Sequence, residues 1–215
     1  MRTSPISQAL SDRLTASIGA WLTSLGQQED DEQDVAAFQS YLGVLRECLE
    51  TLATNAAPRD KWESFWSGCS VILRSTKLSH DFTLEVDDLR GNLCLSSSLA
   101  YSQHLPKMTD EFWREVLGLG EHADVAFVSD RANNEGKSIV WAIMRDHLEL
   151  ATTVAEDLSD EHFLAAGTLQ LTWPLGKGMS GICQAAAGAF RRLYRLNYML
   201  YRHQYITSHS KKKGQ

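Results

Sequence analysis

The sequence lacks the features that would place the protein in a membrane or a secretory pathway. It contains no run of 18 apolar residues, and its first eight residues include no continuous apolar segment. A membrane-spanning helix and a signal peptide both require such segments. We therefore expect no membrane association and a cytoplasmic location.

Patterns typical of metal sites and disulfide frameworks are missing as well. The four cysteines form no Cys-x-x-Cys pair, none of the seven histidines follows a glutamate by three residues, and no His-Glu-x-x-His occurs. This spacing predicts buried free thiols and no metal site. The cysteines are Cys48, Cys69, Cys94 and Cys183.

Catalytic motifs are also missing. The nearest approach to a nucleophile elbow, Gly-x-Ser-x-Gly, is Gly178-Met-Ser180-Gly181-Ile182, which misses the final glycine by one residue. The adjacent acids Asp87 and Asp88 would point apart on a helix and would not share a proton. We expect a non-catalytic protein without a cofactor and predict no catalytic residues.

The composition predicts a folded protein with a large core. The chain has 215 residues, of which 43% are hydrophobic, and includes six tryptophans. Apolar residues recur at helical spacing over most of the chain, so we predict a mainly α, single-domain bundle of six to eight helices over residues 1–206. At most a small edge β element is expected, around 123–128 and 168–173, and 207–215 is predicted to be a basic flexible tail. The predicted helices cover 4–25, 35–52, 62–73, 109–117, 140–158 and 182–206.

The stretch 77–107 allows more than one interpretation. Residues 82–86 alternate like a strand, yet helical spacing continues beyond them. Residues 86–105 loosely resemble a helix-turn-helix, which would make the protein a DNA-binding regulator. The match is poor because Arg90 and Cys94 replace the small residue and the turn glycine of that motif. The alternative is two short helices of the core.

Two loops resemble phosphate-binding loops. In the segment 131–138, Lys137 could reach a phosphate and Ser138 a magnesium ion, as in a nucleotide-binding switch or enzyme. The first glycine of such a loop is missing, and a capped helix start explains the segment equally. The glycines of 176–181 have dinucleotide-fingerprint spacing, but no second strand with an acid follows. Their amides could still bind an anion beside Lys177 and Gly178.

Charge is distributed very unevenly along the chain. The first 190 residues carry 14 basic and 27 acidic residues, a formal charge of −13, whereas the last 25 carry seven basic residues and no acid. In a helix over 182–206, Arg191, Arg195 and Arg202 would lie on an outward face beside Tyr198, and Lys211, Lys212 and Lys213 would extend the charge.

This basic segment indicates a binding role. Arginine and tyrosine suit a nucleic-acid backbone with unpaired bases, and they also suit an acidic protein surface. The protein is therefore expected to be an adaptor subunit of a hetero- or homo-oligomeric assembly that contacts one of these partners. In the alternative interpretation, the arginines pair with acids of the protein's own body.

Overall fold

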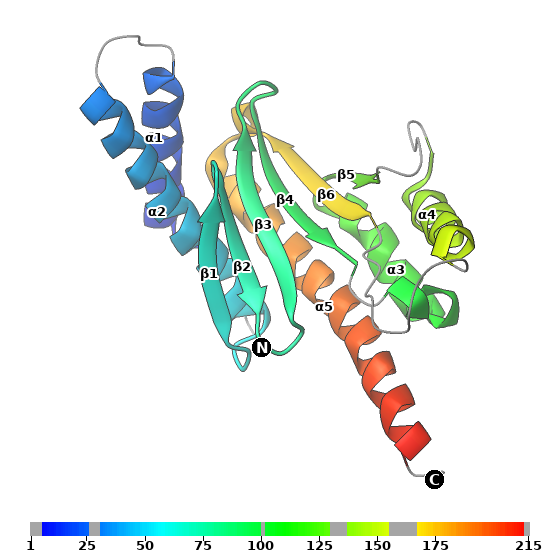
Figure 1. Ribbon diagram of the computed structural model, residues 1–215. Coiled ribbons are helices and arrows are strands. Elements are labelled where there is room, and N and C mark those ends of the chain that lie inside the picture. The colour runs from blue at the N-terminus through cyan, green and yellow to red at the C-terminus, as the bar shows by residue number, and fades with distance from the viewer. Residues whose placement is uncertain (1–5, 26–30, 100–101, 130–136, 155–166, 213–215) are drawn as a thin grey trace. The chain divides into compact units, whose positions relative to one another are not determined.

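A computed structural model shows an α+β fold and describes residues 6–25, 31–99, 102–129, 137–154 and 167–212. Its centre is a six-stranded antiparallel sheet with the strand order β1-β2-β3-β4-β6-β5 (Figure 1). The prediction of an all-α helical bundle is therefore wrong. The helices are α1 (Gln8–Ser24), α2 (Asp31–Ala56), α3 (Asp110–Gly118), α4 (Ile139–Val154) and α5 (Met179–Lys212). The strands are β1 (Trp62–Ser67), β2 (Ser70–Ser75), β3 (His80–Asp87), β4 (Asn92–Ser98), β5 (Asp124–Val128) and β6 (Thr168–Pro174).

The first two helices agree with the sequence prediction. The side chain of Ser7 caps α1 by accepting a hydrogen bond from the Leu10 amide at 3.2 Å; the predicted cap, Ser4, lies outside the described residues. Trp21 of α1 stacks on Tyr41 of α2 with ring centroids 4.2 Å apart. The Tyr41 hydroxyl donates to the Cys69 carbonyl and accepts from the Val86 amide, both at 3.1 Å. These contacts join α1 and α2 to the sheet.

The segment predicted as a third helix, 62–73, forms the β1–β2 hairpin instead. Trp62 pairs with Ser75, and Ser67 pairs with Ser70, which leaves Gly68 and Cys69 as a two-residue turn. Gly68 has φ +57° whereas Cys69 does not have a positive φ, which is the pattern of a type II′ turn with glycine at its first central position. The apolar residues of this segment have helical spacing, but its aromatic and β-branched residues also favour strands, and Gly68 supplies the positive φ of the turn between them.

Residues 77–107 contain a second hairpin, so the helix-turn-helix interpretation of 86–105 is wrong. β3 pairs with β2, and alternate residues of β3 are buried, including Phe82 and Leu84. Between β3 and β4, the Arg90 amide donates to the Asp87 carboxylate at 3.1 Å, and Gly91 adopts φ +63°. A turn with this chemistry joins two strands rather than two helices.

Strands were expected around 123–128 and 168–173, and both are present as β5 and β6. β5 is at the edge of the sheet, whereas β6 lies between β4 and β5. The prediction that all strand structure would be small and near an edge is therefore wrong. Pro174 is the last residue of β6, where its missing amide interrupts the pairing least.

The chain divides into two compact units. Unit 1 comprises residues 1–95 and 172–191, and unit 2 comprises residues 96–171 and 192–215, so α5 contributes to both. In unit 1, Phe190 of α5 packs against Phe82 of β3, with ring centroids 4.9 Å apart. In unit 2, the fully buried Asn197 donates to the Ser97 hydroxyl of β4 at 3.3 Å. The buried residues of α5 recur at helical spacing and include Ile182, Ala186, Ala189, Leu193, Leu196 and Leu200.

The cysteines have the state expected from their spacing. All four are free thiols, three of them buried and Cys69 half-buried. Cys48 of α2 and Cys183 of α5 share a hydrogen bond inside unit 1. This hydrogen bond and burial hold the pKa of the Cys48 thiol well above its usual value, while the same bond lowers that of Cys183.

Candidate functional site

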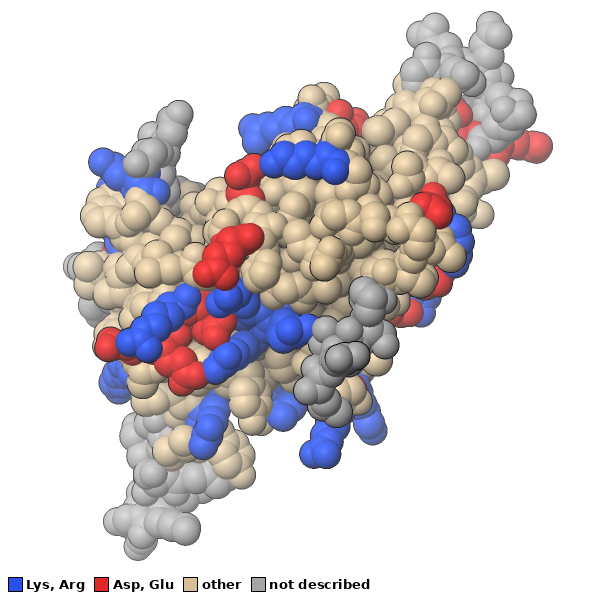
Figure 2. Space-filling view, turned by 180° about the vertical axis from the view of Figure 1, so that it is seen from behind, with Lys and Arg blue, Asp and Glu red and all other residues tan. Residues whose placement is uncertain are grey.

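Two arginines of α5 are held by acidic side chains that lie between residues 110 and 121. Arg192 pairs with Glu115 at 2.9 Å and with Glu121 at 2.8 Å. Arg195 pairs with Glu115 at 2.7 Å and also with Glu111. On the face shown in Figure 2, acidic and basic side chains also gather in one cluster. Internal neutralisation, the alternative weighed from the sequence, is confirmed for Arg195.

The other predicted contact residues differ in their surroundings. Arg191 and Arg202 are exposed, and no ion pair joins either of them to another described residue. Arg191 belongs to unit 1, and Arg202 belongs to unit 2. Lys211 and Lys212 lie in the last turn of α5, and Lys213 lies outside the described residues. Of the arginines predicted on the outward face of α5, Arg191 and Arg202 therefore remain as separate exposed side chains.

The tyrosines of α5 stack on one another along the helix. The rings of Tyr194 and Tyr198 are 6.4 Å apart and nearly parallel, with an angle of 8° between them, and Tyr198 and Tyr201 are 6.3 Å apart. All three side chains are half-buried. A ring that already packs on its neighbours offers less surface to an unpaired base. This arrangement weakens the expectation that Tyr198 stacks on nucleic acid.

An exposed stripe lies further along α5. Tyr205 is 53% exposed and Ile206 is 54% exposed. Arg202 precedes Tyr205 by three residues and Ile206 by four. Residues at these spacings share one face of a helix. We call Arg202, Tyr205 and Ile206 the α5 stripe. The sequence prediction did not include Tyr205 or Ile206, although Ile206 follows Arg202 by four residues, a spacing that places both on one face of a helix.

The predicted anion site precedes α5. Lys177 is the last residue of a short 3₁₀ turn, and Gly178 follows it; both are exposed. The carbonyl of Gly178 accepts the Ile182 amide at 3.2 Å, so this residue begins the helix. Gly178 has φ +86°, a conformation that glycine adopts readily at a sharp entry into a helix.

Only the end of the predicted nucleotide loop, 131–138, belongs to the described residues. The Ser138 hydroxyl accepts the Trp141 amide at 3.3 Å, and the Ser138 carbonyl accepts the Ala142 amide at 2.9 Å. Ser138 is therefore the N-cap of α4. The Lys137 ammonium lies 5.5 Å from the centre of the Trp141 ring. The two residues predicted to bind phosphate and magnesium thus both have structural contacts in α4.

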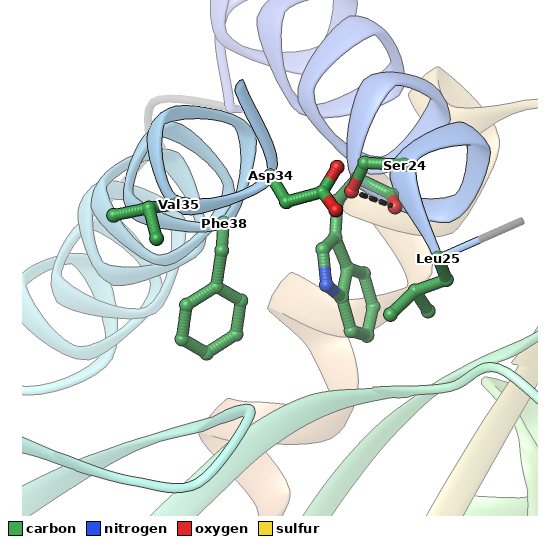
Figure 3. Close-up of a pocket in the computed structure, with 6 residues that line it drawn as sticks. Ser24, Leu25, Asp34, Val35 and Phe38 are labelled. Carbon is green, nitrogen blue, oxygen red and sulfur yellow. Dashed lines mark hydrogen bonds between the residues drawn. The ribbon is translucent and has the colours of Figure 1, made fainter. Parts of the chain in front are cut away.

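A groove that was not predicted from the sequence lies between the end of α1 and the start of α2. Its volume is about 460 Å³, and its lining is mostly apolar. Asp34 points toward Ser24 across the groove, and Phe38 and Leu25 lie on either side (Figure 3). Leu25 is 57% exposed and Val35 is 54% exposed. The residues of this α1–α2 groove are Trp21, Ser24, Leu25, Asp34, Val35 and Phe38.

A second hollow of about 450 Å³ shares Ser24 and Asp34 with the groove. Its other residues are small or short, among them Gly19, Ala20 and Ala37. No ion pair joins Asp34 to another residue within the described ranges. Its carboxylate is thus bordered by two hollows, at a place where a cation could reach it.

Unit 2 contains a buried histidine without a partner for its ring nitrogens in the described part of the chain. His104 is 8% exposed, and neither ring nitrogen has a hydrogen-bond partner there. Its ring lies 4.9 Å from that of His203 on α5. Burial, helped by His203 and Lys107, lowers the pKa of His104 below its usual value. This histidine is therefore neutral in the folded protein near pH 7.

The described residues contain no group of three or more histidine, cysteine or acidic side chains that could hold a metal ion. Among them, no helix is both long and apolar enough to cross a lipid bilayer. In comparisons with known proteins, no family model, curated protein or solved structure matches this chain. The function must therefore be argued from the surfaces described above.

Proposed function

We propose that the protein is a non-catalytic binding subunit that contacts an acidic protein surface through the α5 stripe. The observation that supports this most is the exposure of Tyr205 and Ile206 near an exposed arginine. Exposed apolar side chains cost free energy in water, and the cost is recovered when a partner covers them. Arginine and tyrosine are the residue types most often found as anchors of protein interfaces.

The same stripe is less suited to nucleic acid. An isoleucine side chain gains nothing from a phosphate backbone, and three tyrosines of α5, Tyr194, Tyr198 and Tyr201, pack on one another and offer less surface to a base. Arg192 and Arg195 are already neutralised by Glu111, Glu115 and Glu121. An acidic protein surface with apolar side chains matches the stripe better, because it can pair with Arg202 and cover Ile206 at the same time.

Fluorescence anisotropy with two probes tests this proposal. One probe is a labelled peptide that repeats glutamate and leucine, and the other is a labelled single-stranded oligonucleotide. We expect binding to the peptide that Arg202→Glu weakens by about tenfold, since a lost and reversed charge contact is worth about 1.4 kcal/mol or more.

Arg59→Glu is the matched control, because it makes the same charge change at an exposed arginine of unit 1. It should leave the affinity for the peptide unchanged. Binding to the oligonucleotide alone would contradict the proposal in favour of nucleic acid. Binding to neither probe, or equal weakening by Arg202→Glu and Arg59→Glu, would also contradict it.

A further inference from the structure

We infer that the acidic partner of the α5 stripe is the α1–α2 groove of a second copy of this chain. This inference rests on the proposed function, since it names the partner of the same stripe. It makes the protein a self-assembling subunit in which the stripe of each copy binds the groove of the next.

The groove and the stripe match in chemistry. The groove offers one carboxylate, Asp34, among the apolar side chains of Trp21, Leu25, Val35 and Phe38. The stripe offers one guanidinium, Arg202, and the apolar bodies of Tyr205 and Ile206. A volume of about 460 Å³ is enough for side chains of this size. The arginine would pair with Asp34 while the apolar side chains fill the groove.

Exposure on both sides supports the same pairing. Leu25 and Val35 are more than half exposed at the groove, as Tyr205 and Ile206 are at the stripe. Each surface thus leaves apolar area in water that the other would cover. Their charges are also opposite over a wider region. The sequence between 29 and 34 holds five acids, whereas the last 25 residues of the chain carry seven basic residues and no acid.

The contact would be between unlike surfaces. A head-to-tail contact of this kind forms either a closed ring or an open chain, and it does not form the twofold dimer in which one surface meets itself. The apparent mass in solution should therefore rise above that of one chain as the protein concentration rises.

A charge exchange tests the pairing of Asp34 with Arg202. Asp34→Arg and Arg202→Glu should each reduce self-association at least tenfold in dissociation constant, as measured by light scattering and sedimentation. The double variant should restore it, because the pair is then reversed but still complementary. The single variants should keep the circular dichroism spectrum and melting temperature of the natural protein, since both side chains lie outside the core.

Mixing two variants tests the head-to-tail geometry without relying on charge. Leu25→Arg blocks the groove but keeps the stripe, and Ile206→Arg blocks the stripe but keeps the groove; both positions are exposed. Each variant alone should be monomeric. Their mixture should form a dimer of one copy of each and nothing larger, because only one intact groove and one intact stripe can meet.

Three outcomes would overturn the inference. They are a natural protein that stays monomeric at all concentrations, a symmetric dimer that either variant alone still forms, and a double charge variant that fails to recover. If the natural protein is monomeric yet binds the glutamate–leucine peptide through Arg202, the inference fails while the proposed function stands. If it binds neither the peptide nor itself, both fail.

Discussion

The carboxylate of Glu115 lies 2.7 Å from the guanidinium of Arg195 and also pairs with Arg192 of the same helix at 2.9 Å. Only 14% of the Glu115 side chain is exposed, so this carboxylate is largely shielded from water. It links α3 to the part of α5 that leads to the stripe. The strength of that link can be measured.

Glu115→Gln should lower the free energy of unfolding by about 1–2 kcal/mol, because a shielded carboxylate that serves two arginines is worth more than an exposed ion pair. Urea denaturation gives the value. Glu121→Gln is the control, since Glu121 pairs with Arg192 but its side chain is 67% exposed. That change should cost less than about 0.5 kcal/mol. Equal losses in the free energy of unfolding would show that shielding from water does not strengthen the ion pairs of Glu115.

The Tyr41 hydroxyl is a second measurable link. Tyr41→Phe removes the acceptor of the buried Val86 amide and the donor to the Cys69 carbonyl. We expect a loss of about 1–3 kcal/mol in the free energy of unfolding, because the amide is left buried without a partner. Tyr205→Phe removes the same hydroxyl from an exposed ring and should have little effect. A neutral Tyr41→Phe would mean that water reaches the Val86 amide.

Alkaline pH should destabilise the fold partly through the same tyrosine. Burial raises the pKa of Tyr41 well above its usual value of about 10. The unfolded chain then releases this proton before the folded protein does, so the stability present below about pH 10 falls as the pH rises further. Burial also raises the pKa of Cys94, to about 11, with the same sign. Unfolding measured from pH 8 to 11 should therefore show a shallower decline in Tyr41→Phe than in the natural protein. An identical decline would contradict the prediction.

Acidic pH should destabilise unit 2 through His104. Because the pKa of His104 is lowered in the folded protein, the unfolded chain binds this proton first. The stability that the neutral ring contributes is complete above about pH 6.5 and is lost as the pH falls below that value. The groups known to face the ring are His203 and Lys107, and both would repel the added charge. His104→Leu should flatten the pH dependence of unfolding between pH 5 and 7, whereas an unchanged dependence would assign it to other groups.

The sequence predicted the helices well, because their apolar residues keep one register over several turns. Helices appear where they were expected at α1, α2, α3, α4 and α5. The β1–β2 hairpin was missed because Trp62, Phe65 and Trp66 have helical spacing. The β3–β4 hairpin was missed because the strand-like alternation of 82–86 is followed by helical spacing. Gly68 and Gly91 mark the turns of the two hairpins. A glycine by itself, however, does not tell whether its turn joins strands or helices.

The candidate site was less predictable than the fold. The charge of α5 is visible in the sequence, but its neutralisation by Glu111 and Glu115 is not, since those acids lie about eighty residues away. The α1–α2 groove could not be predicted for the same reason. Its lining comes from the end of one helix and the start of the next, and only their packing places Trp21 beside Phe38.

Ser138 has a structural role as the N-cap of α4, whereas its sequence context suggests nucleotide binding. The two roles can be distinguished by mutation. Because the Ser138 hydroxyl caps α4, Ser138→Ala should lower the free energy of unfolding by about 1 kcal/mol, and Ser138→Asp should retain most of it, since aspartate also caps helices. Thermal unfolding with and without magnesium and ATP provides the readout. We expect no shift with the nucleotide in the natural protein, in either Ser138 variant or in Lys137→Ala. A nucleotide-induced rise in melting temperature that Lys137→Ala abolishes would instead establish a phosphate site at this loop, and Ser138 would then have to be reassigned from cap to ligand.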